Sequence, residues 1–172
     1  MRLIILQLFL SFIFNNVTSA DVVSDAKWKS INPINHEHLI EIQNRLQKLL
    51  PNAKKALVSI ETDDGGGSGV IVSEDGLVLT AAHVIGKTGQ KMNVRLINGK
   101  RVSAISLGGS EISDAGMLRI TQKGKWPFSP IAKRETSKVG DWCFAIGHPG
   151  GFDKKRGVVV RLGRVIGKNE DT

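Results

Sequence analysis

The stretch that decides the fold reads Leu77-Val78-Leu79-Thr80-Ala81-Ala82-His83-Val84-Ile85. Its first four residues are apolar or β-branched, which favours a short β-strand. Small residues follow the strand pattern, and then a histidine. A second segment, Ser113-Asp114-Ala115-Gly116-Met117-Leu118-Arg119-Ile120, places an aspartate just before another strand pattern. His83 and Asp114 are therefore the candidate functional pair of this chain.

The composition favours a β-rich domain. The chain has 172 residues, of which 41% are hydrophobic, enough for one ordinary domain or two small ones. Nineteen glycines against five prolines indicate strands joined by tight turns. Cys143 is the only cysteine, so no internal disulfide is possible, and its apolar neighbours predict a buried side chain. The net charge is +8, but the basic residues are scattered and no aromatic residues lie between them, so we expect no nucleic-acid binding.

The N-terminus has the pattern of a secretory signal peptide. Arg2 precedes a mostly apolar stretch at residues 3–17, and the small residues Thr18-Ser19-Ala20 provide a cleavage site. We predict a signal peptide at residues 1–20 and an exported mature chain, secreted or periplasmic, that starts near Asp21. The apolar stretch is shorter than the roughly 20 residues that cross a bilayer, so we expect no membrane span after cleavage.

A linker and one helix precede the strand patterns, together covering residues 21–51. Residues 36–50 carry apolar side chains at helical spacing, Asn35 can cap them, and Pro51 is expected to end the helix. The apolar stripe, expected to pack on the following domain, consists of Leu39, Ile42, Leu46 and Leu49. His36-Glu37-His38 is read as a solvated helix start rather than a metal site, because residues two apart do not share a helix face.

From residue 56 onward the pattern is one of short strands and turns. The predicted strands are residues 56–61, 69–73, 77–80, 93–97, 101–107, 117–121, 141–146 and 158–165. Asn98-Gly99 predicts a hairpin with a type I′ turn. Many short strands with frequent turns indicate an all-β fold, an antiparallel barrel or a sandwich.

The chemistry of His83 and Asp114 points to nucleophilic acyl transfer. Such a reaction needs an imidazole that takes and returns a proton, and a carboxylate that fixes its tautomer. The order histidine, aspartate, serine is one of the orders in which this triad occurs. A lone histidine or aspartate at a strand end is more often structural, so the pair needs support from the rest of the chain.

Four segments resemble the chymotrypsin-fold serine peptidases, and most closely the HtrA/Deg branch. They are Gly67-Ser68-Gly69-Val70-Ile71-Val72, residues 76–84 around His83, Asp114 with Met117-Leu118-Arg119-Ile120, and residues 139–150 ending in Ile146-Gly147-His148-Pro149-Gly150. The resemblance implies a first β-barrel at residues 52–131 and the start of a second at residues 138–172. It also implies that His83 is the general base and Asp114 its orienting partner. Gly116 departs from the family pattern and is expected to loosen the packing behind Asp114.

The third member of the triad has no candidate in this sequence. The family's nucleophile lies in Gly-(Asn/Asp)-Ser-Gly-Gly-Pro, and that motif is absent. Ser129 and Ser137 have no glycines around them, and Ser68 matches the family's opening strand. His148, between Gly147 and Pro149, is expected to be structural. We therefore predict the N-terminal part of a longer protease, inactive by itself.

Two functions follow from these expectations. The first is a serine endopeptidase that acts on protein or peptide substrates and uses no metal or cofactor. The alternative is a non-catalytic secreted remnant of a protease domain that binds peptides or proteins through exposed strand edges. The sequence beyond Thr172 would distinguish them.

Overall fold

The computed structural model describes residues 35–62, 65–133 and 136–167. The predicted signal peptide and residues 21–34 of the predicted linker lie outside these ranges. One helix is followed by eight strands and a short 3-10 turn. The elements in chain order are α1 (His36–Ala56), β1 (Leu57–Thr62), β2 (Gly65–Ile71), β3 (Leu77–Thr80), the 3-10 turn Ala82–Val84, β4 (Lys91–Leu96), β5 (Arg101–Ser110), β6 (Ala115–Ile120), β7 (Trp142–Gly147) and β8 (Val159–Arg164).

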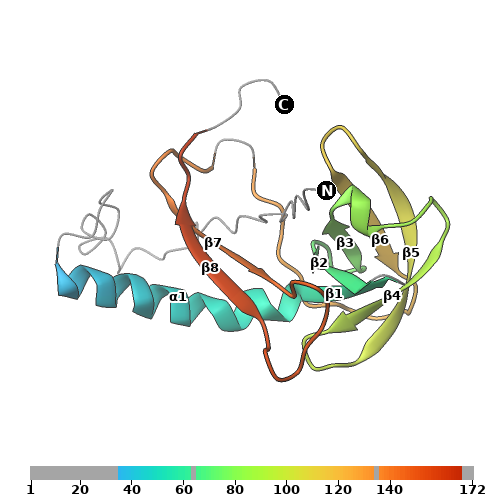
Figure 1. The fold of residues 1–172 in the computed structure, drawn as a ribbon, viewed down its shortest axis with the longest axis horizontal. Coiled ribbons are helices and arrows are strands. Elements are labelled where there is room, and N and C mark those ends of the chain that lie inside the picture. The colour runs from blue at the N-terminus through green and yellow to red at the C-terminus, as the bar shows by residue number, and fades with distance from the viewer. Residues whose placement is uncertain (1–34, 63–64, 134–135, 168–172) are drawn as a thin grey trace, which may run out of the picture.

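Six strands form a closed antiparallel barrel in the order β1-β2-β3-β6-β5-β4 (Figure 1). β1 closes the barrel because it pairs with β2 on one side and with β4 on the other. Closure leaves no unpaired strand edge in this unit. This confirms the all-β, chymotrypsin-like barrel predicted from the strand patterns, with eight strands close to the predicted positions.

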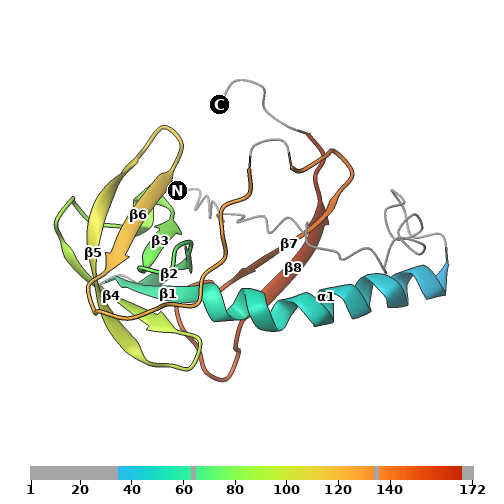
Figure 2. The same cartoon turned by 180° about the vertical axis from the view of Figure 1, so that it is seen from behind.

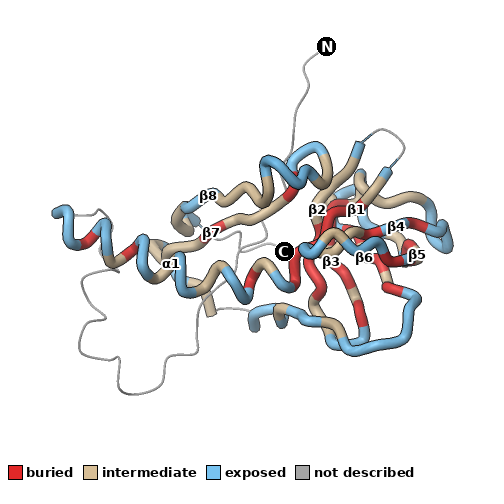
Figure 3. Tube along the Cα trace, turned by 90° about the horizontal axis from the view of Figure 1, so that it is seen from below, coloured by how far each residue is buried: buried red, intermediate tan, exposed pale blue. Residues whose placement is uncertain are grey.

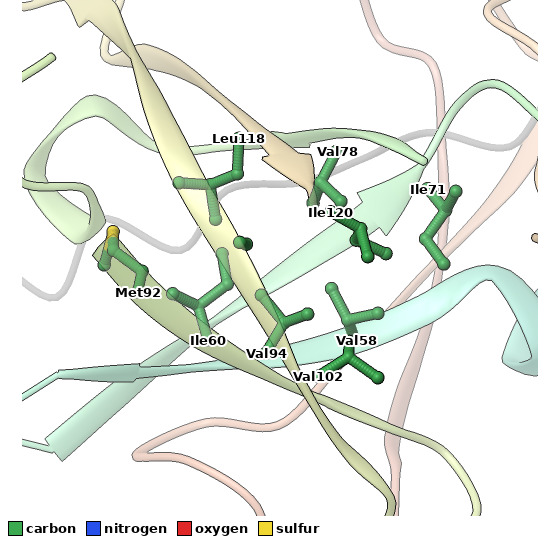
Figure 4. Packing of buried hydrophobic residues seen from close by; sticks show 10 residues of the cluster. Val58, Ile60, Ile71, Val78, Met92, Val94, Val102, Leu118 and Ile120 are labelled. Atoms are coloured by element: carbon green, nitrogen blue, oxygen red, sulfur yellow. The ribbon is translucent and has the colours of Figure 1, made fainter. Parts of the chain in front are cut away.

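The barrel interior is filled by side chains that alternate along the strands. In the first four residues of β4 and the first six of β5, every second residue is buried, as the pleat of a strand predicts. The buried cluster consists of Val58, Ile60, Ile71, Val78, Met92, Val94, Val102, Ala104, Leu118 and Ile120 (Figure 4). Every strand of the barrel contributes to it, so this one cluster holds together the strands that carry the candidate pair.

Leu118 offers a direct test of this core. The residue is fully buried in β6, and its truncation to alanine leaves a cavity that a closed barrel cannot easily collapse. We expect Leu118→Ala to lower the free energy of unfolding by about 2–5 kcal/mol, measured by urea denaturation. Leu107→Ala, on the exposed face of the neighbouring β5, is the matched control and should change stability by under about 1 kcal/mol. Equal effects of the two variants would contradict the assigned core.

A second sheet of two strands, β7 and β8, stands beside the barrel. β7 contacts β1 and β2. The connection from β6 runs along the barrel before it reaches β7 (Figure 2), and the backbone N–H groups of Trp126 and Ser129 tie it to the carbonyls of Glu74 and Ile71, both at 2.9 Å. The hairpin is therefore a separate sheet held against one side of the barrel.

The helix is longer than the sequence predicts. α1 continues through Pro51 to Ala56, where the prediction ended it at Pro51. Proline removes one helical hydrogen bond but does not prevent the next turn, which is buried at Ala53 and Ala56 where the helix joins β1. Figure 3 shows this buried end where α1 meets the barrel, while the rest of the helix extends away from the barrel.

Of two further expectations for α1, one holds in part and one is wrong. In the predicted apolar stripe Ile42 is buried, Leu46 and Leu49 are partly buried, and Leu39 is half exposed. His38 is buried rather than solvated, while His36 is exposed. In the described ranges, no group of three or more metal-ligating side chains lies together.

The β4–β5 hairpin forms as predicted, but with a different turn. The N–H of Gly99 donates to the Leu96 carbonyl at 2.8 Å, and the Leu96 N–H donates to Lys100 at 2.9 Å. Gly99 alone has a positive φ of 85°, while a type I′ turn needs positive φ at both central residues. The loop is a three-residue hairpin in which Gly99 takes the left-handed position, so the type I′ prediction is wrong.

Two smaller observations complete the fold. Cys143 in β7 is a free cysteine and only partly buried, less than predicted, and burial raises the pKa of its thiol. Among the described residues, no helix has the length and apolarity that crossing a bilayer requires.

Candidate active site

The register of two barrel strands brings His83 and Asp114 together. β3 pairs with β6 so that Thr80, the last residue of β3, lies opposite Gly116 near the start of β6. His83 follows Thr80 by one short turn, and Asp114 precedes Gly116 by two residues. Antiparallel pairing therefore places both side chains at the same end of the barrel, although 31 positions separate them in sequence.

The two side chains make direct hydrogen bonds. The His83 Nδ1 atom lies 2.9 Å from both carboxylate oxygens of Asp114. The backbone N–H of His83 also donates to Oδ1 at 3.2 Å, and the Ala82 N–H donates to the Asp114 carbonyl at 3.1 Å. Since an ionised carboxylate only accepts, Nδ1 carries the hydrogen and Nε2 is left to accept a proton. This is the orientation that a histidine general base needs.

The surroundings keep Asp114 ionised and His83 accessible. The hydrogen bond from the His83 side chain lowers the pKa of Asp114 below its ordinary value of 3.8, which outweighs the opposing effect of desolvation, and the backbone N–H groups of His83 and Ala82 add to the lowering. The Asp114 side chain is 21% exposed and the His83 side chain 57%. The imidazole can therefore meet a second reactant, while the carboxylate lies behind it.

The backbone of Asp114 is unusual. Its φ of 48° makes it the one non-glycine residue with positive φ in the described part of the chain. Aspartate tolerates this conformation better than most residues. The conformation turns the carboxylate toward His83 just before β6 begins, so the turn and the strand together fix its direction.

Gly116 packs tightly, contrary to the sequence-based expectation. A Cβ atom there would lie 2.7 Å from Ile85 Cδ1 and 2.9 Å from the Ala81 carbonyl oxygen. Both neighbours belong to the segment that carries His83. Glycine thus lets the turn of His83 approach the strand that follows Asp114. The Ile85 side chain occupies the space that a larger residue at position 116 would need.

No serine takes the place of a nucleophile in the described residues. The hydrogen bonds of the His83 ring there go to Asp114 alone. Ser129 lies in the connection after β6, where its N–H is bound to Ile71. Ser137 lies in irregular backbone before β7, and the hydroxyl of Ser68 accepts the N–H of His148.

Sequence reasoning missed the close packing of the glycine-rich strand β2. A Cβ on Gly67 would meet the Val84 side chain at 2.5 Å, and one on Gly66 would lie 3.1 Å from the Cα of Gly151. The turn that carries His83 and the turn after β7 thus both rest on β2. Repeated glycines inside a strand pattern are the signal that indicates such close approach.

Comparison with known proteins finds one matching family and several relatives. The family model for the trypsin-like peptidase domain matches residues 67–172, well over half of the chain. A relative from Rickettsia prowazekii, named as a DegP-like periplasmic serine endoprotease, is 28% identical over 91% of this chain and 30% of its own length. Relatives with the same name from Chlamydia trachomatis and Ectopseudomonas mendocina are 34% and 39% identical, over 70% and 57% of this chain and 24% and 21% of their own lengths.

The closed barrel and the histidine–aspartate pair at its end define the class, the chymotrypsin-fold serine peptidases. Together with the match over residues 67–172, they show that the chain belongs to the trypsin-like peptidase family, in its HtrA-like branch. The chain spans about a fifth to a third of the length of the relatives named above.

Proposed function

We propose that this chain is the N-terminal part of an exported serine endopeptidase, with His83 as general base and Asp114 as the carboxylate that orients it. The observation that carries the proposal is the contact of His83 Nδ1 with both oxygens of Asp114 at 2.9 Å. That contact occupies Nδ1 and leaves Nε2 available on a side chain that is 57% exposed. The names of the relatives, as periplasmic endoproteases, support protein substrates and export.

The roles of the two residues follow from their positions. As a serine oxygen attacks the peptide carbonyl, His83 takes the hydroxyl proton on Nε2 and returns it to the departing amine. Asp114 accepts the hydrogen on Nδ1 throughout and stabilises the imidazolium that forms. The 172 residues contain no Gly-(Asn/Asp)-Ser-Gly-Gly-Pro motif, so we expect no turnover from this chain by itself.

The missing groups belong to the second barrel. β7 and β8 form a sheet of only two strands, and two strands do not close a barrel. We assign residues 138–172 to the start of this barrel, and residues 1–20 to the signal peptide. The serine and the N–H groups of the oxyanion hole would then come from chain beyond Thr172.

A serine-directed probe tests this function. The protein isolated from its natural source should react with a biotinylated fluorophosphonate, and the modified peptide should map beyond Thr172. Heat-denatured protein is the control and should not react, because an unactivated serine is a weak nucleophile. Labelling of Ser68, Ser129 or Ser137, or none in a protein that extends past Thr172, would contradict the proposal.

The alternative is a secreted peptide-binding remnant, and the open edges of the β7–β8 sheet in the described region favour it. The same experiment distinguishes the two functions. An intact mass that corresponds to a chain ending at Thr172, with no labelling, would support the remnant.

A further inference from the structure

The loop that joins β7 to β8 begins with a turn that one hydrogen bond ties to the barrel. The Ser68 hydroxyl oxygen, on β2, accepts the backbone N–H of His148 at 2.7 Å. The packing is close at this point, because a Cβ on Gly147 would lie 2.9 Å from the same oxygen. On its other side, β2 touches Val84 next to His83. The Ser68–His148 contact thus links the hairpin to the strand that supports the turn of His83.

The imidazole of His148 is enclosed at this contact. The residue is 1% exposed, and neither ring nitrogen has a hydrogen-bond partner among the described residues. Its ring packs on Phe152, with ring centroids 5.3 Å apart. In this position the neutral imidazole is favoured over the charged one. Protonation would add a second N–H to a buried ring that has no hydrogen-bond acceptor beside it among the described residues.

The charges around His148 also disfavour a proton. Desolvation by burial, and then the charge of Arg156 on the same loop, lower the pKa of His148 below its ordinary 6.5. The guanidinium of Arg95, from β4, lies 5.4 Å from the centroid of Phe152. Two carboxylates belong to elements around the turn, and both have other partners. Glu61 of β1 pairs with Arg95, and Asp153 accepts the N–H groups of its own loop.

The described residues of β2, and the strand ends next to the turn, carry no charge. β2 contributes glycines and Ser68. The ends of β7 and β8 next to the turn contribute Ile146, Gly147, Val159 and Val160. Among the described residues, no carboxylate makes a hydrogen bond to the His148 ring.

We propose that Ser68 and His148 form a proton-sensitive junction, in which the Gly147–Phe152 turn stays docked on β2 only while the His148 imidazole is neutral. Protonation requires the ring to reach water, and the turn leaves β2 with it. The junction sets the position of the β7–β8 hairpin relative to the His83 turn. This proposal depends on the contacts of the fold and is independent of the proposed catalysis.

The direction of the pH effect follows from the pKa of His148 in the docked turn and in the released turn. The released ring titrates near 6.5 and the docked ring below it, so protons favour release as the pH falls under 6.5. Docking is therefore fully stabilised above pH 6.5. Below that value, each pH unit should reduce the docking equilibrium by up to about tenfold, until the pKa of the docked ring is reached.

Hydrogen exchange of the His148 amide in the 172-residue chain measures this equilibrium. We expect the protection factor, corrected for the intrinsic rate at each pH, to fall by up to about tenfold per unit as the pH is lowered from 6.5. The amide of Ser106, a buried residue of β5 that donates to the Gln90 carbonyl at 2.9 Å, is the internal control and should not follow that slope. A His148 protection factor that does not change with pH would overturn the proposal.

Substitutions identify the groups responsible. His148→Asn should make protection of residue 148 independent of pH, and Ser68→Ala should lower it at every pH, whereas Ser103→Ala on the exposed face of β5 should have no effect. The same acid slope in His148→Asn would show that the imidazole is not the sensor.

A second pair of variants tests the junction if His148→Asn fails to fold. Arg156→Gln and Arg156→Lys both lose the guanidinium bond to the Gly151 carbonyl, but only the glutamine variant loses the charge. The pKa of the docked His148 ring should therefore be higher in Arg156→Gln than in Arg156→Lys, so the acid-induced loss of protection should be smaller in Arg156→Gln and should stop at a higher pH. Identical transitions in the two would contradict the proposed electrostatics. Because the readout is exchange in the isolated chain, failure here leaves the proposed protease function intact.

Discussion

Replacement of His83 by alanine in the intact protein should remove essentially all peptidase activity. Without Nε2 no group accepts the proton of the serine, so the nucleophile stays a neutral hydroxyl. Loss of the histidine from a complete triad lowers kcat by about 10⁶-fold. We expect a loss of that order, measured on an unfolded protein substrate, with little change in thermal stability because the His83 side chain is 57% exposed.

His36→Ala is the matched control for this experiment. His36 is exposed at the start of α1, and it makes no contact with the candidate pair. Its replacement should leave kcat within about twofold of the wild type, since surface substitutions away from a site have small effects. A His83→Ala protein that keeps activity within tenfold of the wild type would show that His83 is not the general base.

The sequence patterns predicted the barrel well because its strands follow simple rules. Alternation along β4 and β5, apolar runs in β1 and β3, and glycines at the turns are local signals, and the structure agrees with them. Local sequence signals did not predict where an element ends when tertiary packing determines its length. Pro51 was expected to end the helix, but the turn after it is buried against the start of β1.

The candidate pair was recognisable for a different reason. His83 and Asp114 lie at strand ends, and the order of segments around them resembles a known family. What the sequence did not show is the set of contacts that holds them, namely Gly116 against Ile85, Gly67 against Val84, and Ser68 with His148. The partners in these contacts cannot be predicted from the residues next to them in sequence. A glycine in a strand indicates only that another group approaches closely, and does not identify that group.

Replacement of Asp114 by asparagine should have the second-largest effect. The asparagine amide can donate to Nδ1, which would place the ring hydrogen on Nε2 and leave that atom unable to accept the serine proton. In an aspartate of this role the change to asparagine lowers kcat by about 10⁴-fold. Asparagine also tolerates the positive φ at this position, so the fold should be preserved.

The nitrogen chemical shifts of the His83 ring separate this effect from simple loss of structure. In the wild-type chain we expect the neutral ring to carry its hydrogen on Nδ1, and in Asp114→Asn on Nε2. Glu111→Gln is the matched control, because Glu111 lies exposed in the same turn and its side chain makes no hydrogen bond to His83. An unchanged tautomer in Asp114→Asn would contradict the orienting role.

The pH dependence of stability gives an independent check on the same carboxylate. The hydrogen bond from His83 holds the pKa of Asp114 below 3.8 in the folded chain, so the unfolded chain binds the proton more readily. The stabilisation from Asp114 is therefore present above pH 3.8 and is lost as the pH falls through the lower, folded value. The difference in stability between the wild type and Asp114→Asn should shrink in that acid range. If the difference stayed constant down to pH 2, the His83 hydrogen bond would not be what stabilises the ionised carboxylate.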